Sequence, residues 1–514
     1  MFEKMLKKMK AYLFSKDKSS TKDASNLCLC ITTLLLLIPL VAAISMRFLI
    51  PCSGYAELNI DTQDEALYPV NDKFLSLGLD STVITEGFKH FNVSNPKLIQ
   101  MIKYLSPAYL RIGGNQADQL IFTRNNSNLI NQKSYVLHAS DWLKLYNLAK
   151  KAEINIIYDL NSLLRNDNGC WNSENAIDMI NFSQENGLSV DWELGNEPNS
   201  YPHKFDAYVN ATQLGLDYHT LRDILNSYDL YKNSLLVGPS TTRLRTKEIE
   251  EYLGDFLESG IEAVSAITFH HYYFSGEDAT WEQFLDIKNF DYLEECIEIV
   301  NKVVAPFASK LKPLWLGETS TAWHGGAPNL SDRFIGSFLW LDKLGLSAKL
   351  KIDLVVRQSV FKDNYALIDN NYDPNPDWWV SLLYKMVVGP EVITTQFEGD
   401  ETIRLYAHCA KGNKLWNNGS TVVVFGVNLS TKNGYVNVKE LHSDKIMYSY
   451  VLNSDNLFSQ YINLNGKTLE LKNDLSLPDI KPNVIERSTD LKMPPHSIVF
   501  WVFTNTNLKA CIKT

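Results

Sequence analysis

Short apolar segments alternate with amphipathic segments over residues 73–390. Each apolar segment is typical of a buried strand, and apolar positions at helical spacing predict the helices between them. The predicted strands are residues 74–79, 109–112, 154–160, 190–194, 234–237, 266–270, 314–317 and 354–358. The predicted helices include residues 95–104, 140–151, 174–185, 247–257, 292–307 and 332–344. Eight strands alternating with helices indicate an α/β chain with a (β/α)8 barrel. A doubly wound sheet is the alternative, but no GxGxxG follows an early strand.

The pattern changes over residues 391–514, where short segments rich in β-branched and aromatic residues follow one another. They predict strands at residues 402–408, 421–428, 445–451, 468–471 and 497–503. Asn-Gly pairs begin at Asn418, Asn433 and Asn465 and mark turns between strands. This region is typical of an accessory β-sandwich.

The amino terminus has the pattern of a targeting or anchoring segment. Residues 1–26 are rich in lysine, and residues 27–46 form an apolar run long enough to span a bilayer. The lysines favour a cytoplasmic amino terminus and a single-pass type II membrane protein. Val41, Ala42 and Ala43 offer an alternative, a cleavage site that would give a secreted protein. Either route places the remaining chain outside the cell or in a lumen such as the lysosome.

Sequons support this secretory route. Asn-x-Ser/Thr sites, which are glycan acceptors in secreted proteins, occur at Asn92, Asn125, Asn181, Asn210, Asn329, Asn418 and Asn428. The seven cysteines contain no CxxC pair, so zinc and redox motifs are absent. The net charge of −10 argues against a nucleic-acid partner, because no basic surplus exists to match a phosphate backbone.

Two glutamates follow predicted strands of the barrel. Glu197 lies in Asn196-Glu197-Pro198 after the fourth strand, and Glu318 lies in Gly317-Glu318-Thr319 at the end of the seventh. Catalytic groups of such barrels sit at the carboxyl ends of strands. Glycoside hydrolysis uses a pair of carboxyls, and a separation of about 5–5.5 Å gives retention through a covalent intermediate. Either motif alone is weak, since Glu197 could simply begin a helix before Pro198.

The pair suggests a division of roles. Glu197 is the predicted general acid/base, with a pKa that burial and a nearby carboxylate raise. Glu318 is the predicted nucleophile and has to stay ionised. Asn196 is placed to hydrogen-bond the sugar 2-hydroxyl, a contact that strengthens in the transition state.

Aromatic and histidine residues follow the sixth and seventh strands. His270 is expected to belong to the core or to orient substrate rather than bind a metal, since HExxH and similar ligand spacings are missing. Tyr272 is expected to hydrogen-bond Glu318. Trp323 offers a face for sugar stacking, and glycines 325 and 326 allow close approach to a ligand, although an ordinary glycine-rich turn is the alternative. No metal or organic cofactor is expected.

These motifs resemble the retaining glycosidase family that contains the heparanases and the leech-type hyaluronidases. The resemblance extends from about residue 73 to residue 511, and its most specific stretches are residues 106–111, 192–200, 270–273, 315–320, 325–328, 340–348, 356–358 and 509–511. It implies a barrel over residues 73–390 and a sandwich that combines residues 55–72 with 391–514. It also implies a Cys409–Cys511 disulfide, Glu197 as acid/base and Glu318 as nucleophile.

Carried over by position, the family's substrate contacts fall on Asp80, Thr82, Asn115, Asn196, His270, Tyr272, Trp323, His324, Gly325, Gln358, Asn364 and Tyr365. The loop after the fifth strand keeps two basic residues that we include as substrate contacts, Arg243 and Arg245. Sulfated chains are bound best by Arg and Lys.

The chain departs from the heparanase pattern in three ways. Only about 40 residues separate Arg111 from Ile154, so an excised linker is missing and no proteolytic activation is expected. The basic cluster at Arg243 is followed by glutamates, and Glu277 stands where the family enzyme has a basic residue. The loss of basic residues counts against a highly sulfated substrate, but the resemblance as a whole implies a retaining endo-β-D-glucuronidase acting on heparan sulfate. Hyaluronan cleavage is one alternative, and a non-catalytic glycosaminoglycan-binding membrane protein is another.

Overall fold

The structure is a computed structural model that describes residues 54–62, 67–124, 135–416 and 419–512. The lysine-rich segment 1–26, the apolar segment 27–46 and the sequons at Asn125 and Asn418 lie outside these residues. Within the described ranges, no helix has the length and apolar character needed to cross a membrane.

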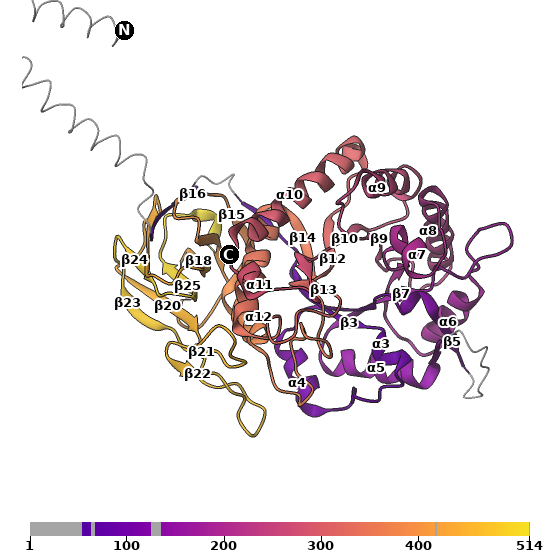
Figure 1. The fold of residues 1–514 in the computed structure, drawn as a ribbon, viewed down its shortest axis with the longest axis horizontal. Helices are drawn as coiled ribbons and strands as arrows, with labels where there is room; N and C mark the ends of the chain where they lie inside the picture. Colours follow the sequence, from indigo (N-terminus) through magenta and orange to yellow (C-terminus); the bar gives the residue numbers. More distant parts are fainter. Residues whose placement is uncertain (1–53, 63–66, 125–134, 417–418, 513–514) are drawn as a thin grey trace, which may run out of the picture.

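Eight parallel strands form a closed barrel (Figure 1). In barrel order they are β10 (Ala266–His271), β12 (Leu314–Thr319), β14 (Ile352–Arg357), β3 (Leu75–Asp80), β4 (Tyr109–Gly113), β7 (Asn155–Leu160), β8 (Asp191–Leu194) and β9 (Leu236–Thr241). Every predicted barrel strand overlaps one of these, and the predicted fold class is confirmed. Glu197 follows β8, the fourth barrel strand, and Glu318 lies in β12, the seventh.

The barrel interior is apolar at one level and charged at another. One buried cluster consists of Tyr109, Ile157, Val237, Ala266, Trp315, Leu354 and Val356, which all lie on barrel strands. Arg111, Asp159 and Glu193 are buried nearer the carboxyl ends of β4, β7 and β8. The apolar cluster thus closes the interior beneath the charged groups.

Helices surround the barrel and bury their apolar faces against it. The long ones are α4 (Pro96–Tyr104), α5 (Ala139–Lys151), α6 (Glu174–Glu185), α8 (Ala211–Asn226), α9 (Lys247–Gly260), α10 (Ile287–Val304), α11 (Phe334–Lys349) and α12 (Pro376–Val387). All residues of α11 from Phe334 to Ala348 are buried. This helix is covered on all sides because it lies between the barrel and the second group of sheets (Figure 1).

Two further sheets form the predicted sandwich. The smaller one has the order β16 (Thr395–Gly399), β1 (Tyr55–Ile60), β19 (Gly434–Lys439) and β24 (Leu491–Met493). The path of the larger one is β2 (Leu67–Pro69), β15 (Val388–Ile393), β17 (Ile403–Ala410), β18 (Thr421–Asn428), β25 (Ser497–Thr504), β20 (Ile446–Asn453), β21 (Asn463–Leu464) and β22 (Lys467–Thr468), and β23 (Asn483–Glu486) also pairs with β20. Leu58, Val424, Val436 and Trp501 belong to one buried cluster between them.

One predicted strand of the sandwich is wrong in extent. Residues 468–471 were predicted as a strand, but β22 comprises Lys467 and Thr468 alone. Its partner β21 offers only two residues, so the ladder ends there. Asn465 and Gly466 both have positive φ and form the tight turn between the two strands, as expected for Asn-Gly.

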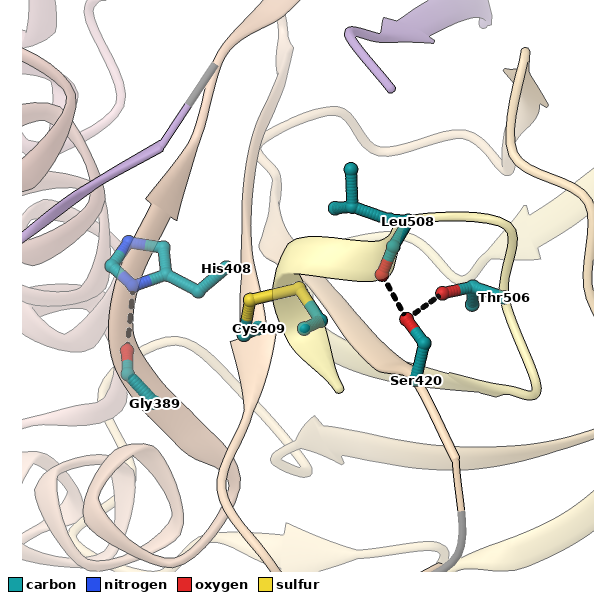
Figure 2. The surroundings of a disulfide bond; sticks show 7 residues. Gly389, His408, Cys409, Ser420, Thr506 and Leu508 are labelled. Atoms are coloured by element: carbon teal, nitrogen blue, oxygen red, sulfur yellow. Dashed lines mark hydrogen bonds between the residues drawn. A yellow bond between two sulfur atoms is a disulfide. The ribbon is translucent and has the colours of Figure 1, made fainter. Parts of the chain in front are cut away.

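A disulfide joins Cys409 on β17 to Cys511 near the end of the chain, as the resemblance implied (Figure 2). Beside the disulfide, the Ser420 hydroxyl donates a hydrogen bond to the backbone carbonyl of Leu508, so a polar contact accompanies the covalent link. The bridge closes a loop of 102 residues. On the chain-entropy view, a loop of this length is worth about 4.7 kcal/mol.

Three of the described sequon asparagines, Asn92, Asn210 and Asn329, are exposed, and Asn181 is half-buried. Asn428 is different. It is fully buried, and its Nδ2 donates to the backbone carbonyls of Lys432, Met493 and Pro494. The predicted glycan at Asn428 is therefore wrong for the folded protein, because the acceptor nitrogen is inside the sandwich and already bonded.

Candidate active site

Glu197 begins a sharp turn at the end of β8. Its backbone is left-handed, with φ of 52°, and its N–H donates to the carbonyl of Ser240 at 2.9 Å. Pro198 then starts a 3-10 turn, Pro198–Ser200, which continues into the short helix α7 (Tyr201–Lys204). A non-glycine residue held at positive φ is the kind of local strain that concentrates at functional sites.

Glu318 lies near the end of β12 and is held from two sides. Its Oε1 accepts a hydrogen bond of 2.7 Å from the Tyr272 hydroxyl, which confirms the predicted contact. Its Oε2 accepts one of 2.8 Å from Arg111 Nη1. Both donors fix the orientation of the carboxylate, as the position of a nucleophile requires.

Glu197 and Glu318 face each other across His270. One donor atom from each of the three side chains can be chosen so that all lie within 4.8 Å of one another. His270 Nδ1 is 3.0 Å from Glu197 Oε1 and 3.9 Å from Glu318 Oε1. This spacing fits the short carboxyl separation of retaining glycosidases better than the roughly 6.5–9.5 Å of inverting ones.

Arg111 is the centre of the buried polar network. Beyond Glu318, its Nε donates to Glu193 Oε2 at 2.6 Å and its Nη2 to Asn196 Oδ1 at 2.8 Å. Asp159 lies 3.8 Å from Nη2. One guanidinium therefore sets the positions of the predicted nucleophile and of Asn196 through its planar fork.

The predicted raised pKa of Glu197 is wrong in this arrangement. Burial pushes the pKa of this carboxyl up, but Lys204 and His270 outweigh burial and hold it below its ordinary value. The Lys204 ammonium forms an ion pair with Glu197 Oε2. The prediction failed because it included burial and Glu318 but no cation beside Glu197.

The same three side chains could in principle hold a cation, because two carboxylates and an imidazole are suitable ligands. The two carboxylates already have protein partners. Glu318 is bonded to Arg111 and Tyr272, and Glu197 is paired with Lys204. Two cationic side chains at the same carboxylates make the site electrostatically unfavourable for a metal.

Most of the predicted substrate contacts lie at the same end of the barrel. Asp80 ends β3, accepts from Gln358 Nε2 at 3.0 Å, and also accepts from the backbone N–H of Thr82. The backbone N–H of Asn364 donates to the carbonyl of Gly325 at 2.7 Å. The Tyr365 ring stacks on Tyr272, with ring centroids 6.3 Å apart. Their roles toward a sugar stay predictions.

Trp323 and His324 belong to a small flap over this end of the barrel. Strand β13 (Ala322–Trp323) pairs with β11 (Phe274–Ser275), which places Glu277 beside His324. His324 Nδ1 is 3.4 Å from Glu277 Oε2, and both side chains are mostly exposed. Glu277 is therefore at the surface of the flap rather than turned into the protein.

Arg243 and Arg245 differ in their surroundings. Arg243 is half-buried, donates to the backbone carbonyl of Tyr272 at 2.8 Å, and lies over the Tyr292 and Trp323 rings. These contacts support the flap. Arg245 is exposed, so of the two it is the one available to a polyanion.

Arg111, Glu193, Asp118 and Lys204 are residues of the site that were not predicted from the sequence as site residues. Glu193 pairs with Arg111, Asp118 accepts the backbone N–H of Asn196 at 2.9 Å, and Lys204 pairs with Glu197. Glu193 had a usable signal, since a charged residue inside a buried strand usually has a partner. Asp118 and Lys204 lie in loops and turns, where the sequence gives no such signal.

The barrel and its paired carboxylates define a glycoside hydrolase. The family comparison specifies which one: residues 85–345 match "Glycosyl hydrolase family 79, N-terminal domain", and the chain belongs to this family. It is 32% identical to heparanase from Bos taurus, covering 90% of this chain and 94% of the relative. It is 31% identical to inactive heparanase-2 from Homo sapiens, covering 86% and 87%. It is 29% identical to hyaluronoglucuronidase from the leech Hirudo nipponia, covering 86% and 97%.

Among solved structures, the fold resembles a 4-O-alpha-L-rhamnosyl-beta-D-glucuronidase from Fusarium oxysporum, with a TM-score of 0.66 and 15% identity. The match covers 87% of this chain and all of the other. At this identity the likeness concerns the fold alone, and it agrees with the barrel and sandwich described above.

Proposed function

We propose that this protein is a retaining endo-β-D-glucuronidase that cleaves internal glucuronosyl linkages of heparan sulfate. The observation that carries the proposal is the Glu197–Glu318 pair, with its spacing within 4.8 Å and two donors on Glu318. The similarity to heparanases supports glucuronosyl linkages as the bond cleaved.

In the proposed mechanism, Glu318 attacks the anomeric carbon while Glu197 donates a proton to the glycosidic oxygen. The leaving sugar departs, and a covalent glycosyl-enzyme remains on Glu318. Glu197 then takes a proton from water, which attacks the same carbon and releases the product with retained configuration. Arg111 and Tyr272 hold the Glu318 carboxylate in position for the attack.

Hyaluronan is the second candidate substrate. The Glu277–His324 pair at the surface of the flap favours it, because an exposed carboxylate there repels sulfate groups. The similarity to the leech hyaluronoglucuronidase points in the same direction. Hyaluronan carries no sulfate groups, so this carboxylate would have no sulfate of the substrate to repel.

A non-catalytic function has to be weighed as well, since inactive heparanase-2 is nearly as similar as heparanase. Both glutamates are present here, and each has polar partners that fix its position. This organisation supports turnover.

For this enzyme we propose a location outside the cell or in a lumen. It would contact a bilayer only if segment 27–46 stays attached.

The deciding experiment is product analysis of the purified protein, incubated separately with heparan sulfate and with hyaluronan at mildly acidic pH. We expect heparan sulfate to be shortened by the intact single chain. Shortening of hyaluronan alone would assign the second function. If the folded protein shortened neither polymer, the enzymatic proposal would be wrong and binding would be measured instead.

Variants of the two glutamates assign their roles. We expect Glu318→Gln to abolish formation of the glycosyl-enzyme, because the amide cannot attack. Glu197→Gln should lose activity on natural chains by about 10²–10⁴-fold, the usual contribution of general acid catalysis. Glu258→Gln on the exposed face of α9 is the matched control and should keep full activity. Normal turnover by Glu318→Gln would refute the nucleophile assignment.

A further inference from the structure

Lys204 is a cation placed directly on the proposed acid/base. Its Nζ pairs with Glu197 Oε2 and donates to Asn115 Oδ1 at 2.6 Å. The side chain comes from the last residue of α7, the short helix that the turn at Glu197 initiates. It keeps 24% of its surface exposed, so the ammonium is within reach of solvent and of an incoming ligand.

This pairing conflicts with the proposed chemistry. A general acid has to carry a proton when the substrate is bound, yet an adjacent ammonium favours the ionised carboxylate. The other charged or titratable groups around Glu197 are His270 on β10, Tyr272 after it, and Glu318 on β12 with its partner Arg111. Lys204 combines direct contact with Glu197 and solvent exposure, whereas the His270 side chain is buried.

Lys204 also borders a cleft outside the carboxylate pair. The cleft has a volume of about 620 Å³, within the range of about 300–1,000 Å³ typical of ligand sites. Besides Lys204, its lining includes His203, Gln119, Asn161, Leu164 and Asp206. The lining mixes polar and apolar groups, and its two basic side chains are neighbours in sequence. A sugar chain extending from the carboxylates into this cleft would bring its anionic groups to Lys204.

We propose that Lys204 is a substrate-responsive positioning residue: it holds Glu197 ionised until an anionic group of the bound glycosaminoglycan draws the ammonium into the cleft. This inference rests on the proposed function and specifies how its acid is formed. The Lys204–Glu197 ion pair is exchanged for an ion pair between Lys204 and a carboxylate or sulfate of the chain. Glu197, now buried beside Glu318, takes one proton from solvent and becomes the acid for the glycosidic oxygen.

The exchange balances in charge and atoms. The complex gains one proton from solvent on Glu197, and no covalent bond changes until Glu197 gives that proton to the departing sugar oxygen. An uncharged chain cannot draw Lys204 away, so it would bind without forming the acid. The device therefore selects anionic substrates at the chemical step as well as at binding.

The first test is the pH dependence of kcat/KM, which reports the free enzyme, on whichever polymer the wild type cleaves. Glu197 is needed protonated, so the rate falls as pH rises through its pKa. An opposite charge in contact lowers a carboxyl pKa by roughly 1–3 units. Lys204→Met should therefore move the basic limb to higher pH by about one unit or more, whereas Lys204→Arg should leave it in place.

The matched control is Lys232→Met, an exposed lysine paired only with Asp229, which should reproduce the wild-type profile. A lysine that merely contacts substrate would lower kcat/KM at every pH without moving the limb. A Lys204→Met profile with an unmoved limb would overturn the proposal. Because the wild type is assayed first, failure of the proposed function itself appears separately, as no cleavage of either polymer.

The second test follows the Glu197 proton without turnover. Infrared difference spectra of protein with and without Glu197→Gln report whether this carboxyl is protonated. We expect Glu197 ionised at pH 5 in protein that carries Lys204, and in Lys204→Met we expect it to take up its proton at higher pH than in the wild type. In protein that keeps Glu318, a tetrasaccharide of the cleaved polymer with a non-hydrolysable linkage should protonate Glu197. A Glu197 titration that Lys204→Met leaves unmoved, or a carboxylate that stays ionised in the complex, would refute the exchange.

Discussion

At the scale of single residues, Arg111 contacts more polar side chains of the site than either glutamate does. It is 3% exposed and bonds Glu193, Glu318 and Asn196. Burial raises the pKa values of Asp159 and Glu193, while the arginine lowers them. The cation therefore allows a group of carboxylates to coexist in the barrel interior.

We predict that Arg111→Met destabilises the protein by about 3–5 kcal/mol near neutral pH, because buried carboxylates lose their counter-charge. Buried carboxyls with raised pKa values favour the folded state only while protonated. The loss should therefore shrink as pH falls and these groups take up protons. Urea unfolding at pH 5 and pH 8 measures the difference.

The matched control is Arg124→Met. Arg124 also contacts two carboxylates, Asp178 and Glu185, but it is exposed. Its loss should cost no more than about 1 kcal/mol at either pH. Equal destabilisation by the two variants would show that the buried position of Arg111 is not the cause of the stability loss.

Residue by residue, the sequence indicated the two glutamates and the Tyr272 hydrogen bond to Glu318, but not the cations that pair with the two carboxylates. Glu197 and Glu318 were identifiable because each follows a strand whose carboxyl end faces the cleft. Lys204 was not, since its contact depends on the left-handed turn at Glu197 that directs α7 back over the site. The burial of Asn428 was equally unpredictable, because its bonds come from Met493 and Pro494, far along the chain.

At the scale of elements, the turn between β8 and α7 is the critical one. Gly195 has φ of 86°, and a Cβ there would lie 2.5 Å from Ser162 Oγ and 2.6 Å from the Tyr201 hydroxyl. Ser162 and Tyr201 are buried and bonded to each other. The turn that presents Glu197 therefore has room for glycine only.

We predict that Gly195→Ala lowers the free energy of unfolding by about 1–3 kcal/mol from backbone strain, with further loss from the contact. Activity should fall more steeply than stability, because Glu197 lies two residues away. Gly187→Ala is the control, since Gly187 also has positive φ but open space around it. Thermal unfolding and turnover of the two variants separate strain from crowding. Similar losses in both would contradict the crowding argument.

The barrel strands were predictable from sequence because buried parallel strands are short apolar runs with clear ends. The prediction was least accurate at β9, which was placed at residues 234–237 and runs from Leu236 to Thr241. Gly238-Pro239 looks like the end of a strand, but β9 continues through it. The barrel closes around these residues, and tertiary pairing outweighs the local turn signal.

At the scale of the whole molecule, the sandwich contains a group that titrates across the acidic range. His408 is fully buried on β17, and burial lowers its pKa to about 4. Its Nδ1 donates to the carbonyl of Gly389 at 2.8 Å (Figure 2). A histidine with a lowered folded-state pKa binds fewer protons when folded, so its contribution to stability is present above about pH 6.5 and lost toward pH 4.

We predict that this loss is about 3 kcal/mol and that His408→Gln, which keeps an amide donor, removes it. Asp118 and Asp191 act in the opposite direction, since burial raises the pKa of each to about 6 and acid favours their folded form. The wild type and the variant therefore have to be compared as a difference between pH 7 and pH 4. His442→Gln at an exposed position should follow the wild type. Parallel stability curves for the wild type and His408→Gln would refute the assignment.

Strand β1 gives the molecule an unusual order of assembly. It lies between β16 and β19, and both neighbours come more than 330 residues later in the chain. At synthesis rates of about 5–20 residues per second, β1 leaves the ribosome on the order of 20–70 s before its partners exist. Throughout that interval Ala56, Leu58 and Ile60 have no sheet to cover them, while the barrel strands emerge behind them. Among the described residues, the first strand made is thus among the last to be paired, so a nascent chain released early would expose an unpaired apolar strand.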